Sequence, residues 1–407
     1  MALTLEQQLD LLMQGTDYGD ATLAATMRAE LRAKLQEDRP LRVYCGYDPR
    51  TADLHIGHTI TMRKLRQFQD LGHQVIFLIG SYTSLVGDPS DKDKTRPVLT
   101  LDEVNANAAT YTEQAFKVLD REKTTVRHNG EWLSQLSLVD FIRIAQSFTV
   151  QQMLARENFA RRYAAGDAIY LQETFYPLMQ GYDAVALQAD VQIGGSDQLF
   201  NIITAGRKLQ EAFGQKPQVG IIMGILPGTD GVVKMSKSLG NHIPLNSDAN
   251  DMYGKIMSVP DFAMPAYFRL ASSWLPDKIA AMEAALNDGS QHPRDIKMAL
   301  AHDITSQFYS PAAANTAQSQ FIQVFQQRAL PDDMPDHTPA PGESLVDVIV
   351  GLNFAASKGE ARRLIQQGGV KLDNAAATDI NLTLTLDQPV VLQVGKRRFA
   401  RLLPPAD

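Results

Sequence analysis

A single cysteine, Cys45, is present among the 407 residues. The chain therefore can form neither an internal disulfide framework nor a zinc site built from several cysteines. Chains without disulfides are typical of a reducing cytosol, so we expect a cytoplasmic protein. No run of eighteen apolar residues occurs, and no segment is predicted to span a membrane. The first residues, MALTLEQQLDLLMQG, lack the basic start and long apolar core of a signal peptide.

The chain also has no excess of positively charged residues. The formal net charge is -7 at pH 7, which argues against a protein that coats DNA without specificity. The sequence contains neither a P-loop nor a G-x-G-x-x-G motif, which argues against a P-loop nucleotidase or a dehydrogenase. With 44% hydrophobic and 21% charged residues, the composition is that of an ordinary folded protein, and the length predicts two or three domains.

Short apolar runs alternate with helical patterns between residues 41 and 223. Each run is flanked by Gly, Pro or Asp, which is typical of buried strands. The predicted strands are 41–47, 74–80, 191–195 and 218–224. Thr100 and Glu103 form a capping box in front of a predicted helix at 101–120. The alternation predicts an α/β fold, in which a Rossmann-like parallel sheet is covered by helices on both faces.

The pattern divides the chain into four parts. The first domain is predicted at 1–247 and begins with a helical extension over residues 1–38. Strand patterns then fade, and amphipathic segments predict an α-helical domain at 248–330. The Pro- and Asp-rich segment 331–344 predicts a linker, and 345–407 predicts a small α+β domain.

The tail from Gly342 onward is less acidic than the rest of the chain. It contains 8 Lys/Arg and 7 Asp/Glu, against 31 and 39 in the residues before it. The clustering of its cations favours a platform for an RNA backbone, and a solvated basic surface is the alternative. The clustered cations are Lys358, Arg362, Arg363, Lys371, Lys396, Arg397, Arg398 and Arg401.

The strongest local motif is DLHIGHTI at 53–60. It follows the first predicted strand and begins a helix, so His55 and His58 are expected near a helix N-terminus, where free N–H groups favour phosphate. Imidazoles at this place can hydrogen-bond phosphate oxygens and stabilise the charge of a transition state. Gly57 would let a flat ring or a phosphate approach the backbone. The alternatives are surface histidines or half of a metal site, but no further Cys or His cluster completes such a site.

A second motif, DGVVKMSKSLGN, covers residues 230–241. Lys234 and Lys237 lie three residues apart in a Gly- and Ser-rich segment, and mobile lysines are suited to following phosphate charge through a reaction. Taken alone, the segment would also be compatible with an ordinary polar turn. Its occurrence after H-x-G-H and after an α/β core makes phosphate chemistry the favoured interpretation.

A third motif, YPLMQGYD, covers 176–183. Tyr176, Gln180 and Asp183 are spaced at i, i+4 and i+7, which predicts that they share one face of a helix. A carboxylate with neutral acceptors suits an ammonium ion. The alternative is that Tyr176 is a core aromatic and Asp183 caps a helix. For Tyr182 we predict a core position.

These motifs resemble those of a known family. HIGH and KMSKS in this order resemble the class I aminoacyl-tRNA synthetases. The segments YCGYDPRTADLHIGH (44–58), GDPSDKDKTR (87–96), YPLMQGYD and QIGGSDQ (192–198) are similar to the bacterial tyrosyl-tRNA synthetases in particular. The C-terminal unit resembles their S-four-like RNA-binding module, and the resemblance extends from about residue 30 to the end. Arg50, where many relatives have a small hydroxyl residue, and LFN after QIGGSDQ depart from the common pattern and indicate a different bacterial branch.

The resemblance implies an enzyme, a ligase. It would activate L-tyrosine with ATP and Mg²⁺, release pyrophosphate, and transfer tyrosine to the 3′ end of tRNA(Tyr) in protein biosynthesis. It also implies a homodimer with an interface around 130–165, an anticodon-side role for the helical domain, and no protein-bound metal, DNA or membrane partner. Three alternatives stay open: a tryptophan-specific relative, a small-molecule nucleotidyltransferase, and a non-catalytic RNA-binding regulator.

The resemblance further implies a role for each motif residue. Tyr44 and Asp183 would hydrogen-bond the phenolic hydroxyl of the substrate. Its ammonium group would meet Asp88, Tyr176 and Gln180, and Gln198 would lie near its carboxylate. The catalytic groups at the ATP phosphates would be His55, His58, Lys92, Arg96, Lys234 and Lys237. Further ATP-binding positions would be Gly46, Asp48, Gly57, Gly195, Asp197, Met235 and Ser236. The tRNA-binding residues would be Lys358, Arg362, Arg363, Lys371, Lys396, Arg397 and Arg398.

Overall fold

The computed structural model describes residues 3–49, 54–90, 99–325, 334–340, 342–373, 375–395 and 398–404. The chain forms two compact units, Met1–Gln318 and Ser319–Asp407. Among the residues that the structure describes, no helix is both long and apolar enough to cross a lipid bilayer.

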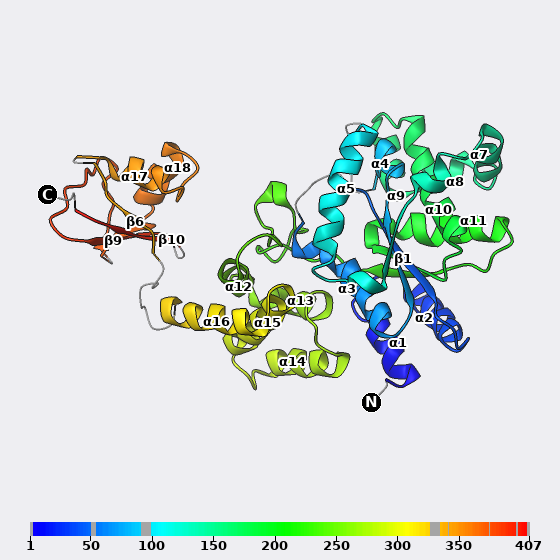
Figure 1. Ribbon diagram of the computed structural model, residues 1–407, viewed down its shortest axis with the longest axis horizontal. Coiled ribbons are helices and arrows are strands. Elements are labelled where there is room, and N and C mark those ends of the chain that lie inside the picture. Colours follow the sequence, from blue (N-terminus) through cyan, green and yellow to red (C-terminus); the bar gives the residue numbers. More distant parts are fainter. Residues whose placement is uncertain are drawn as a thin grey trace. The chain divides into compact units, whose positions relative to one another are not determined.

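The first unit is built on a five-stranded parallel sheet with the order β3-β2-β1-β4-β5 (Figure 1). The strands are β1 (Arg42–Tyr47), β2 (Gln74–Ile79), β3 (Thr124–His128), β4 (Val191–Gly195) and β5 (Val219–Met223). The chain builds β1, β2 and β3 in one direction and then crosses to β4 and β5 on the other side of β1. Such a reversal of strand order opens a crevice at the carboxyl ends of β1 and β4, where ligands of α/β sheets bind. The predicted parallel α/β fold is confirmed.

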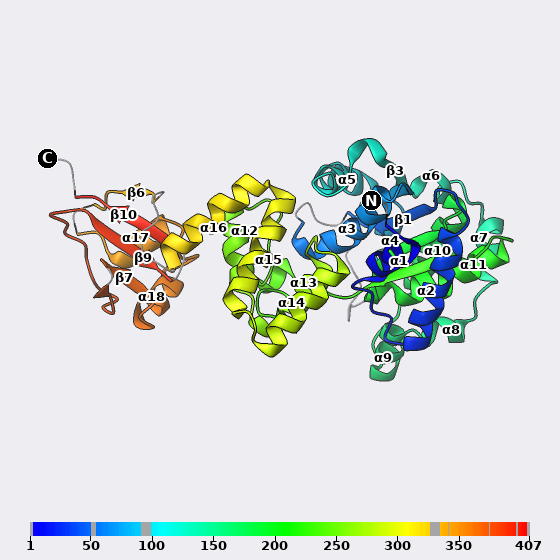
Figure 2. The same cartoon turned by 90° about the horizontal axis from the view of Figure 1, so that it is seen from below.

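Helices lie on both sides of this sheet, and α3 and α10 flank β1 (Figures 1 and 2). The helices up to residue 212 are α1 (Leu5–Met13), α2 (Ala21–Leu35), α3 (Ile56–Asp70), α4 (Thr83–Val86), α5 (Leu101–Ala115), α6 (Gly130–Leu133), α7 (Leu138–Ala145), α8 (Val150–Leu154), α9 (Glu157–Ala165), α10 (Phe175–Leu187) and α11 (Arg207–Ala212). The predicted capping box of Thr100 and Glu103 is present at the start of α5. A π-helical segment, Phe200–Gly206, precedes α11.

Strand β1 presents its side chains alternately to the two helical layers. Tyr44 packs with Ile76 of β2 and with residues of α10 on one face. On the other face, the ring of Tyr47 stacks on Phe77 with centroids 4.5 Å apart. The Tyr47 hydroxyl lies 2.9 Å from the Oγ1 atom of Thr61 in α3. The period of two along a strand thus links β1 to both layers.

After the sheet, the chain is helical. The helices are α12 (Ala249–Met257), α13 (Met264–Leu270), α14 (Pro276–Asp288), α15 (Pro293–Phe308) and α16 (Pro311–Phe325). Prolines at the first turns of α13, α14 and α15 suit those positions because the N–H group missing from proline would have no partner there.

The second unit packs two helices, α17 (Leu345–Gly351) and α18 (Lys358–Gln366), on a small mixed sheet. The sheet has the order β6-β10-β9-β7-β8, with β6 (Asp336–His337), β7 (Val370–Leu372), β8 (Ala375–Ala376), β9 (Val390–Val394) and β10 (Arg398–Leu402). Fully buried Val348, Ile365 and Leu392 belong to its core. The short strand β6 lies inside the segment predicted as a linker and pairs with β10.

Candidate active site

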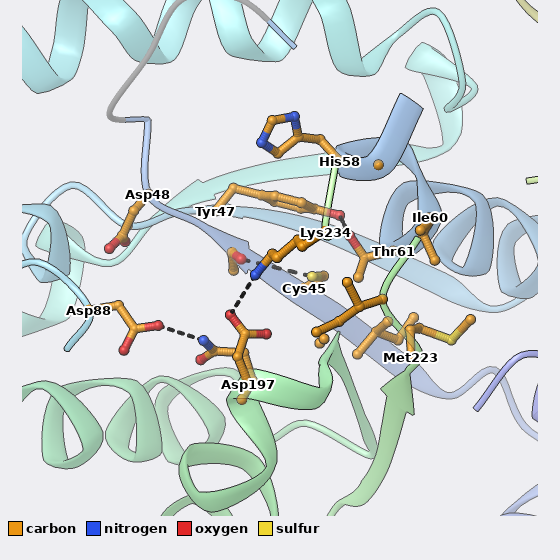
Figure 3. Close-up of a pocket in the computed structure, with 18 of the residues that line it drawn as sticks. Cys45, Tyr47, Asp48, His58, Ile60, Thr61, Asp88, Asp197, Met223 and Lys234 are labelled. Atoms are coloured by element: carbon orange, nitrogen blue, oxygen red, sulfur yellow. Dashed lines mark hydrogen bonds and ion pairs between the residues drawn. The ribbon is translucent and has the colours of Figure 1, made fainter. Parts of the chain in front are cut away.

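The carboxyl ends of β1, β4 and β5 open into a cavity of about 610 Å³. This volume is within the usual range of small-molecule sites. Many residues singled out in the sequence line this cavity, and Figure 3 shows several of them. The lining includes Gly46, Asp48, His55, Gly57, His58, Asp88, Tyr176, Gln180, Asp183, Gly195, Asp197, Gln198, Lys234, Met235 and Ser236.

The two histidines of HIGH stand at the entry to α3. His55 is the N-cap residue, and its ring packs on that of His58 with centroids 3.8 Å apart. Burial lowers the pKa of His55 to about 3, and the neighbouring His58, His242 and Lys234 act in the same direction. Burial and Lys234 lower the pKa of His58 to about 4. Both rings are therefore neutral at physiological pH.

The His58 ring has a defined tautomer. Its Nδ1 atom accepts a hydrogen bond of 3.2 Å from the backbone N–H of His55, so the ring proton is on Nε2. A Cβ atom on Gly57 would lie 3.0 Å from the Cε1 atom of His55, closer than side chains normally approach. Glycine at this position therefore lets the His55 ring fold over the start of the helix. The result is a compact pair of neutral rings at the N-terminus of α3.

The segment 228–240, hereafter the lysine loop, forms another wall of the cavity. Met235 is buried, whereas Lys234 is half exposed and its Nζ lies 3.8 Å from the Oδ2 atom of Asp197. Figure 3 shows the amine of Lys234 directed at this carboxylate. Lys237 begins a 3-10 turn, Lys237–Leu239, and lies outside the set of lining residues.

Two buried groups, the carboxylate of Asp183 and the hydroxyl of Tyr44, lie near one another. Asp183 in α10 is 2% exposed and accepts hydrogen bonds from Trp132 Nε1 at 2.8 Å and Asn129 Nδ2 at 3.3 Å. Burial raises the pKa of Asp183 to about 8, although both hydrogen bonds lower it. The hydroxyl of Tyr44 is buried and has no hydrogen-bond partner among the described residues. Burial raises the pKa of Tyr44, and the charge of Asp183 raises it further.

A buried hydroxyl without a partner is costly unless a ligand completes it. Tyr44 in β1 is not among the residues that line the cavity, but it lies close enough to Asp183, which does line it, for the carboxylate to act on its ionisation. A ligand group that can both donate and accept a hydrogen bond would satisfy both residues. The pair of Tyr44 and Asp183 is thus suited to a hydroxyl group.

A second polar cluster, around Asp88, Gln180 and Gln198, also lines the cavity. Asp88 accepts a hydrogen bond of 2.5 Å from Gln198 Nε2, and Arg156 lies 3.4 Å from the same carboxylate. Asn201 donates to the side-chain oxygens of both Gln180 and Gln198 at 2.9 Å. Carboxylate and amide oxygens of this kind can bind an ammonium group.

Tyr176 donates a hydrogen bond of 3.0 Å to Asp48, which also accepts one of 2.8 Å from Thr83. The structure therefore brings residues of the third motif to the end of β1. Within the described ranges, no three His, Cys, Asp or Glu side chains gather in a way that could hold a metal ion.

Some partners in this site have no sequence signal. The predicted site residues are contacted by side chains that come from distant parts of the chain, namely Arg156, Asn129, Trp132 and Asn201. None of them belongs to a spacing that indicates a ligand. Their positions follow only from the packing of helices on the sheet.

Other predicted residues lie elsewhere. Lys92, Arg96, Lys396 and Arg397 lie outside the described residues. In the second unit, Arg362 and Arg363 are exposed on α18, and Lys371 is half-buried in β7. Lys358 forms an ion pair of 2.6 Å with Asp347, and Arg398 donates a hydrogen bond to the carbonyl of Phe354.

Two family descriptions match most of the chain between them. The description "tRNA synthetases class I (W and Y)" matches residues 36–326. The description "Tyrosine--tRNA ligase SYY-like C-terminal domain" matches residues 325–402. The first range covers most of the first unit, and the second range covers most of the second unit.

Individual proteins show the same likeness. The chain is 48% identical to the tyrosine–tRNA ligase of Moorella thermoacetica, over 97% of this chain and 95% of that protein. It is 46% identical to the tyrosine–tRNA ligase of Thermotoga maritima, over 92% of this chain and 93% of that protein. Among solved structures, it is similar in fold to the Archaeoglobus fulgidus tyrosyl-tRNA synthetase complexed with L-tyrosine. That similarity has a TM-score of 0.59 and 21% identity over 77% of this chain and 100% of the other.

Proposed function

We infer the reaction from one premise, namely that this chain belongs to the class I tRNA synthetases and, within them, to the tyrosine–tRNA ligases. The enzyme joins L-tyrosine to tRNA at the expense of ATP. One observation supports most directly the proposed position of the substrate tyrosine. The Tyr44 hydroxyl is buried near Asp183 and has no hydrogen-bond partner among the described residues. A phenol at this point would accept a hydrogen bond from Tyr44 and donate one to Asp183.

In the proposed first step, a carboxylate oxygen of tyrosine attacks the α-phosphorus of ATP. A new P–O bond forms, the bond between the α-phosphorus and the bridging oxygen breaks, and pyrophosphate leaves with its electron pair. The step needs no covalent intermediate with the protein. Its catalysis comes from positioning and from stabilisation of charge. Mg²⁺ bound to the phosphates of ATP would neutralise part of their charge.

We assign the ATP phosphates to the HIGH helix and the lysine loop. Neutral His58 carries its proton on Nε2, so this nitrogen can donate to a phosphate oxygen without a change of protonation. Lys234 would exchange its ion pair with Asp197 for the leaving pyrophosphate. Lys237, together with Lys92 and Arg96 of the segment 87–96, would add positive charge.

The ammonium group of tyrosine is proposed to lie among Asp88, Tyr176 and Gln180. Support comes from the carboxylate of Asp88, which is 9% exposed and borders the cavity. The ammonium would compete with Gln198 for this carboxylate. Gln198, released from Asp88, would then face the tyrosine carboxylate. The remaining ATP positions, Gly46, Asp48, Gly57, Gly195, Asp197, Met235 and Ser236, border the same cavity.

Pyrophosphate exchange into ATP, measured with each amino acid in turn, tests this assignment. We expect exchange with tyrosine alone. Exchange with tryptophan would support the tryptophan-specific alternative. Exchange with none would support the non-catalytic RNA-binding regulator. Exchange with a substrate that is not an amino acid would indicate a small-molecule nucleotidyltransferase.

Tyr44→Phe is expected to weaken selection of tyrosine over phenylalanine without loss of stability. The variant removes a hydroxyl that has no hydrogen-bond partner in the described part of the chain, so we expect folding to lose no hydrogen bond. With tyrosine bound, one neutral hydrogen bond is lost, which is worth about 0.5–1.5 kcal/mol. The measurements are kcat/KM for both amino acids and the melting temperature. An unchanged ratio of the two kcat/KM values would remove Tyr44 from the recognition of the hydroxyl.

In the second step, a ribose hydroxyl at the 3′ end of tRNA attacks the carbonyl carbon of the adenylate, and AMP leaves. We propose that the second unit binds tRNA through Lys358, Arg362, Arg363, Lys371, Lys396, Arg397 and Arg398. The exposure of Arg362 and Arg363 on α18 supports this. The ion pair of Lys358 with Asp347 and the hydrogen bond of Arg398 would have to exchange for phosphate. The helical region 248–330 is assigned to the anticodon side.

Removal of residues from Gly342 onward is expected to spare pyrophosphate exchange and to abolish most tRNA charging. The cut removes the cations of α18 and β7 and leaves the cavity of the first unit intact. Because phosphate contacts release counterions, tRNA affinity of the full chain should fall steeply with salt, and affinity of the shortened chain less so. Equal charging by both forms would contradict the assignment.

We further propose a homodimer, with its interface on α7, α8, α9 and the segment that follows them. Large apolar side chains are exposed there, and a monomeric protein rarely exposes a large apolar patch. The exposed side chains are Leu138, Val139, Ile142, Val150, Tyr163, Tyr170 and Leu171. The interface would overlap the predicted range 130–165. Charged tRNA is used in the cytoplasm, which is the proposed location.

Leu138→Asp combined with Val139→Asp is therefore expected to convert the dimer to a monomer. Both side chains are 75% exposed in the single chain, so the substitutions disturb no core. Two carboxylates in an apolar interface would be buried without partners, which is strongly unfavourable. Sedimentation velocity measures the outcome, and Val232→Asp, equally exposed at 75% on the lysine loop, is the matched control for oligomeric state. A doubly substituted chain that still sediments as a dimer would place the interface elsewhere.

A further inference from the structure

Asn241 is the residue that follows the lysine loop, and it is 6% exposed although the residues just before it are exposed. Its Oδ1 atom accepts a hydrogen bond of 2.8 Å from the backbone N–H of Ser236. Its Nδ2 atom donates to Asp230 Oδ2 at 2.5 Å and lies 3.3 and 3.4 Å from the carbonyl oxygens of Val233 and Lys234. One amide side chain therefore binds the loop backbone on both sides of Lys234.

Asp230 completes this arrangement from the other end of the loop. Its Oδ1 atom accepts hydrogen bonds from the backbone N–H groups of Val232 at 2.7 Å and Val233 at 2.8 Å. The hydrogen bond from Asn241 is the largest cause that lowers the pKa of Asp230, so this carboxylate stays ionised. The backbone N–H of Met235 donates to the carbonyl of Leu226 at 3.1 Å. The backbone around Lys234 is thus held by side chains as well as by main-chain bonds.

Space for Asn241 is reserved by Gly228. A Cβ atom on Gly228 would lie 2.3 Å from both the Cγ and the Nδ2 atoms of Asn241, and 2.6 Å from its carbonyl oxygen. Any larger residue at 228 would displace the amide. The backbone N–H of Thr229 also donates to the Asn241 carbonyl at 2.8 Å. The first turn of the loop is therefore closed directly on Asn241.

Asn241 is also close in the chain to a contact with the HIGH motif. The backbone N–H of Ile56 donates to the carbonyl of Ile243, and the N–H of Leu245 donates to the carbonyl of Leu54, both at 3.0 Å. These two bonds fix the chain after Asn241 against the start of α3. The side chain of Asn241 thus connects a backbone fixed at HIGH to the backbone that carries Lys234.

We propose that Asn241 is a positioning residue for tyrosine activation: it holds the backbone of 233–236 so that Lys234 meets the phosphates bound at the HIGH helix. This inference rests on the proposed function of the pocket. Asn241 itself touches no substrate. Its effect passes through Lys234 and should therefore be visible in the rate of adenylate formation and absent from the affinity for tyrosine.

The test measures single-turnover formation of tyrosyl-adenylate at saturating ATP and Mg²⁺, together with the Kd for tyrosine. Asn241→Ala is expected to lower the rate about 10- to 100-fold, the order of loss that a misplaced catalytic group causes. The Kd for tyrosine should not change. Asn246→Ala is the matched control, because Asn246 bonds to Lys117 outside the loop, and it should keep the wild-type rate.

The decisive comparison uses Lys234→Ala as the background. If Asn241 acts through Lys234, then adding Asn241→Ala to Lys234→Ala should cost less than about threefold, because coupled residues are not additive. The inference would be overturned if the rate in the double variant fell by the product of the two single-variant reductions. It would also be overturned if Asn241→Ala kept the wild-type rate. Should Asn241→Ala melt below the assay temperature, Asp230→Asn changes an exposed side chain and removes the charge that Asn241 Nδ2 binds, and it should slow the same step while the Kd for tyrosine stays the same. Absence of adenylate in the wild-type protein would instead contradict the proposed function.

Discussion

Lys234→Ala will slow the formation of tyrosyl-adenylate by roughly 100- to 1,000-fold, the effect expected when a preorganised charge contact worth about 2.7–4 kcal/mol disappears from a transition state. The tyrosine Kd should stay the same, because Lys234 pairs with Asp197 on the side of the cavity that we propose for the phosphates. Lys237→Ala should change the rate in the same direction. Single-turnover kinetics with a separate tyrosine titration measure both quantities.

The stability of the protein should not explain this loss. The side chain of Lys234 is 52% exposed, and an exposed ion pair contributes little to folding. Lys216→Ala is the matched control, because Lys216 is an exposed lysine that pairs with Glu37 away from the cavity. Wild-type rates in Lys234→Ala would show that this lysine has no part in the chemistry.

Asp183→Asn will narrow the preference for tyrosine over phenylalanine by roughly 10- to 150-fold. When assayed above pH 8, where the carboxyl group of Asp183 is ionised, the variant keeps the shape of the side chain but removes its charge, and hydrogen bonds to charged groups are worth about 1.5–3 kcal/mol. Only tyrosine has the hydroxyl that makes this bond, so its kcat/KM should fall while that of phenylalanine changes little. An unchanged ratio between the two amino acids would separate Asp183 from the recognition of the hydroxyl.

For Asp183→Asn we also expect that the difference in melting temperature from the wild type depends on pH. Folding raises the pKa of Asp183 to about 8 from an ordinary value of 3.8. Between these values the folded protein holds a proton that the unfolded chain has released, so this contribution to stability is present at low pH and is lost as pH rises through 8. The amide that replaces the carboxyl group in the variant does not titrate. The melting temperature of Asp183→Asn should therefore improve relative to wild type between about pH 5 and pH 8, and a constant difference would contradict the raised pKa.

Local sequence signals predicted the central strands well because each is short, apolar and buried on both faces. The observed strand at 191–195 has the predicted bounds, and the one at 74–79 differs by a single residue. The capping box at Thr100 was found because it depends on neighbours three residues apart. The edge strand β3, TTVRH, was missed because its residues are polar or half-buried and resemble a loop.

The site residues that belong to local sequence motifs could be predicted. Those that reach the site only through tertiary packing could not. HIGH, the lysine loop and the helix 176–183 meet at one cavity, since carboxyl ends of parallel strands share one edge. Tyr182 packs in the core against Phe213 with ring centroids 5.6 Å apart, and its predicted core position is confirmed. The contacts of Arg156 and Trp132 join residues more than fifty positions apart. No local periodicity encodes such pairs.

The alternation of Tyr44 and Tyr47 on β1 has a consequence for the kinds of genetic change that this gene can tolerate. Tyr44 faces the layer of α10, and Tyr47 faces Thr61 of α3. Insertion or deletion of one codon within β1 would exchange these faces, since side chains of a strand alternate with a period of two. One such change would remove both the Tyr44 hydroxyl that we propose to bind the substrate and the contact of Tyr47 with the HIGH helix α3. A point substitution in β1 affects only one of these features at a time. We therefore expect β1 to tolerate substitutions better than insertions or deletions.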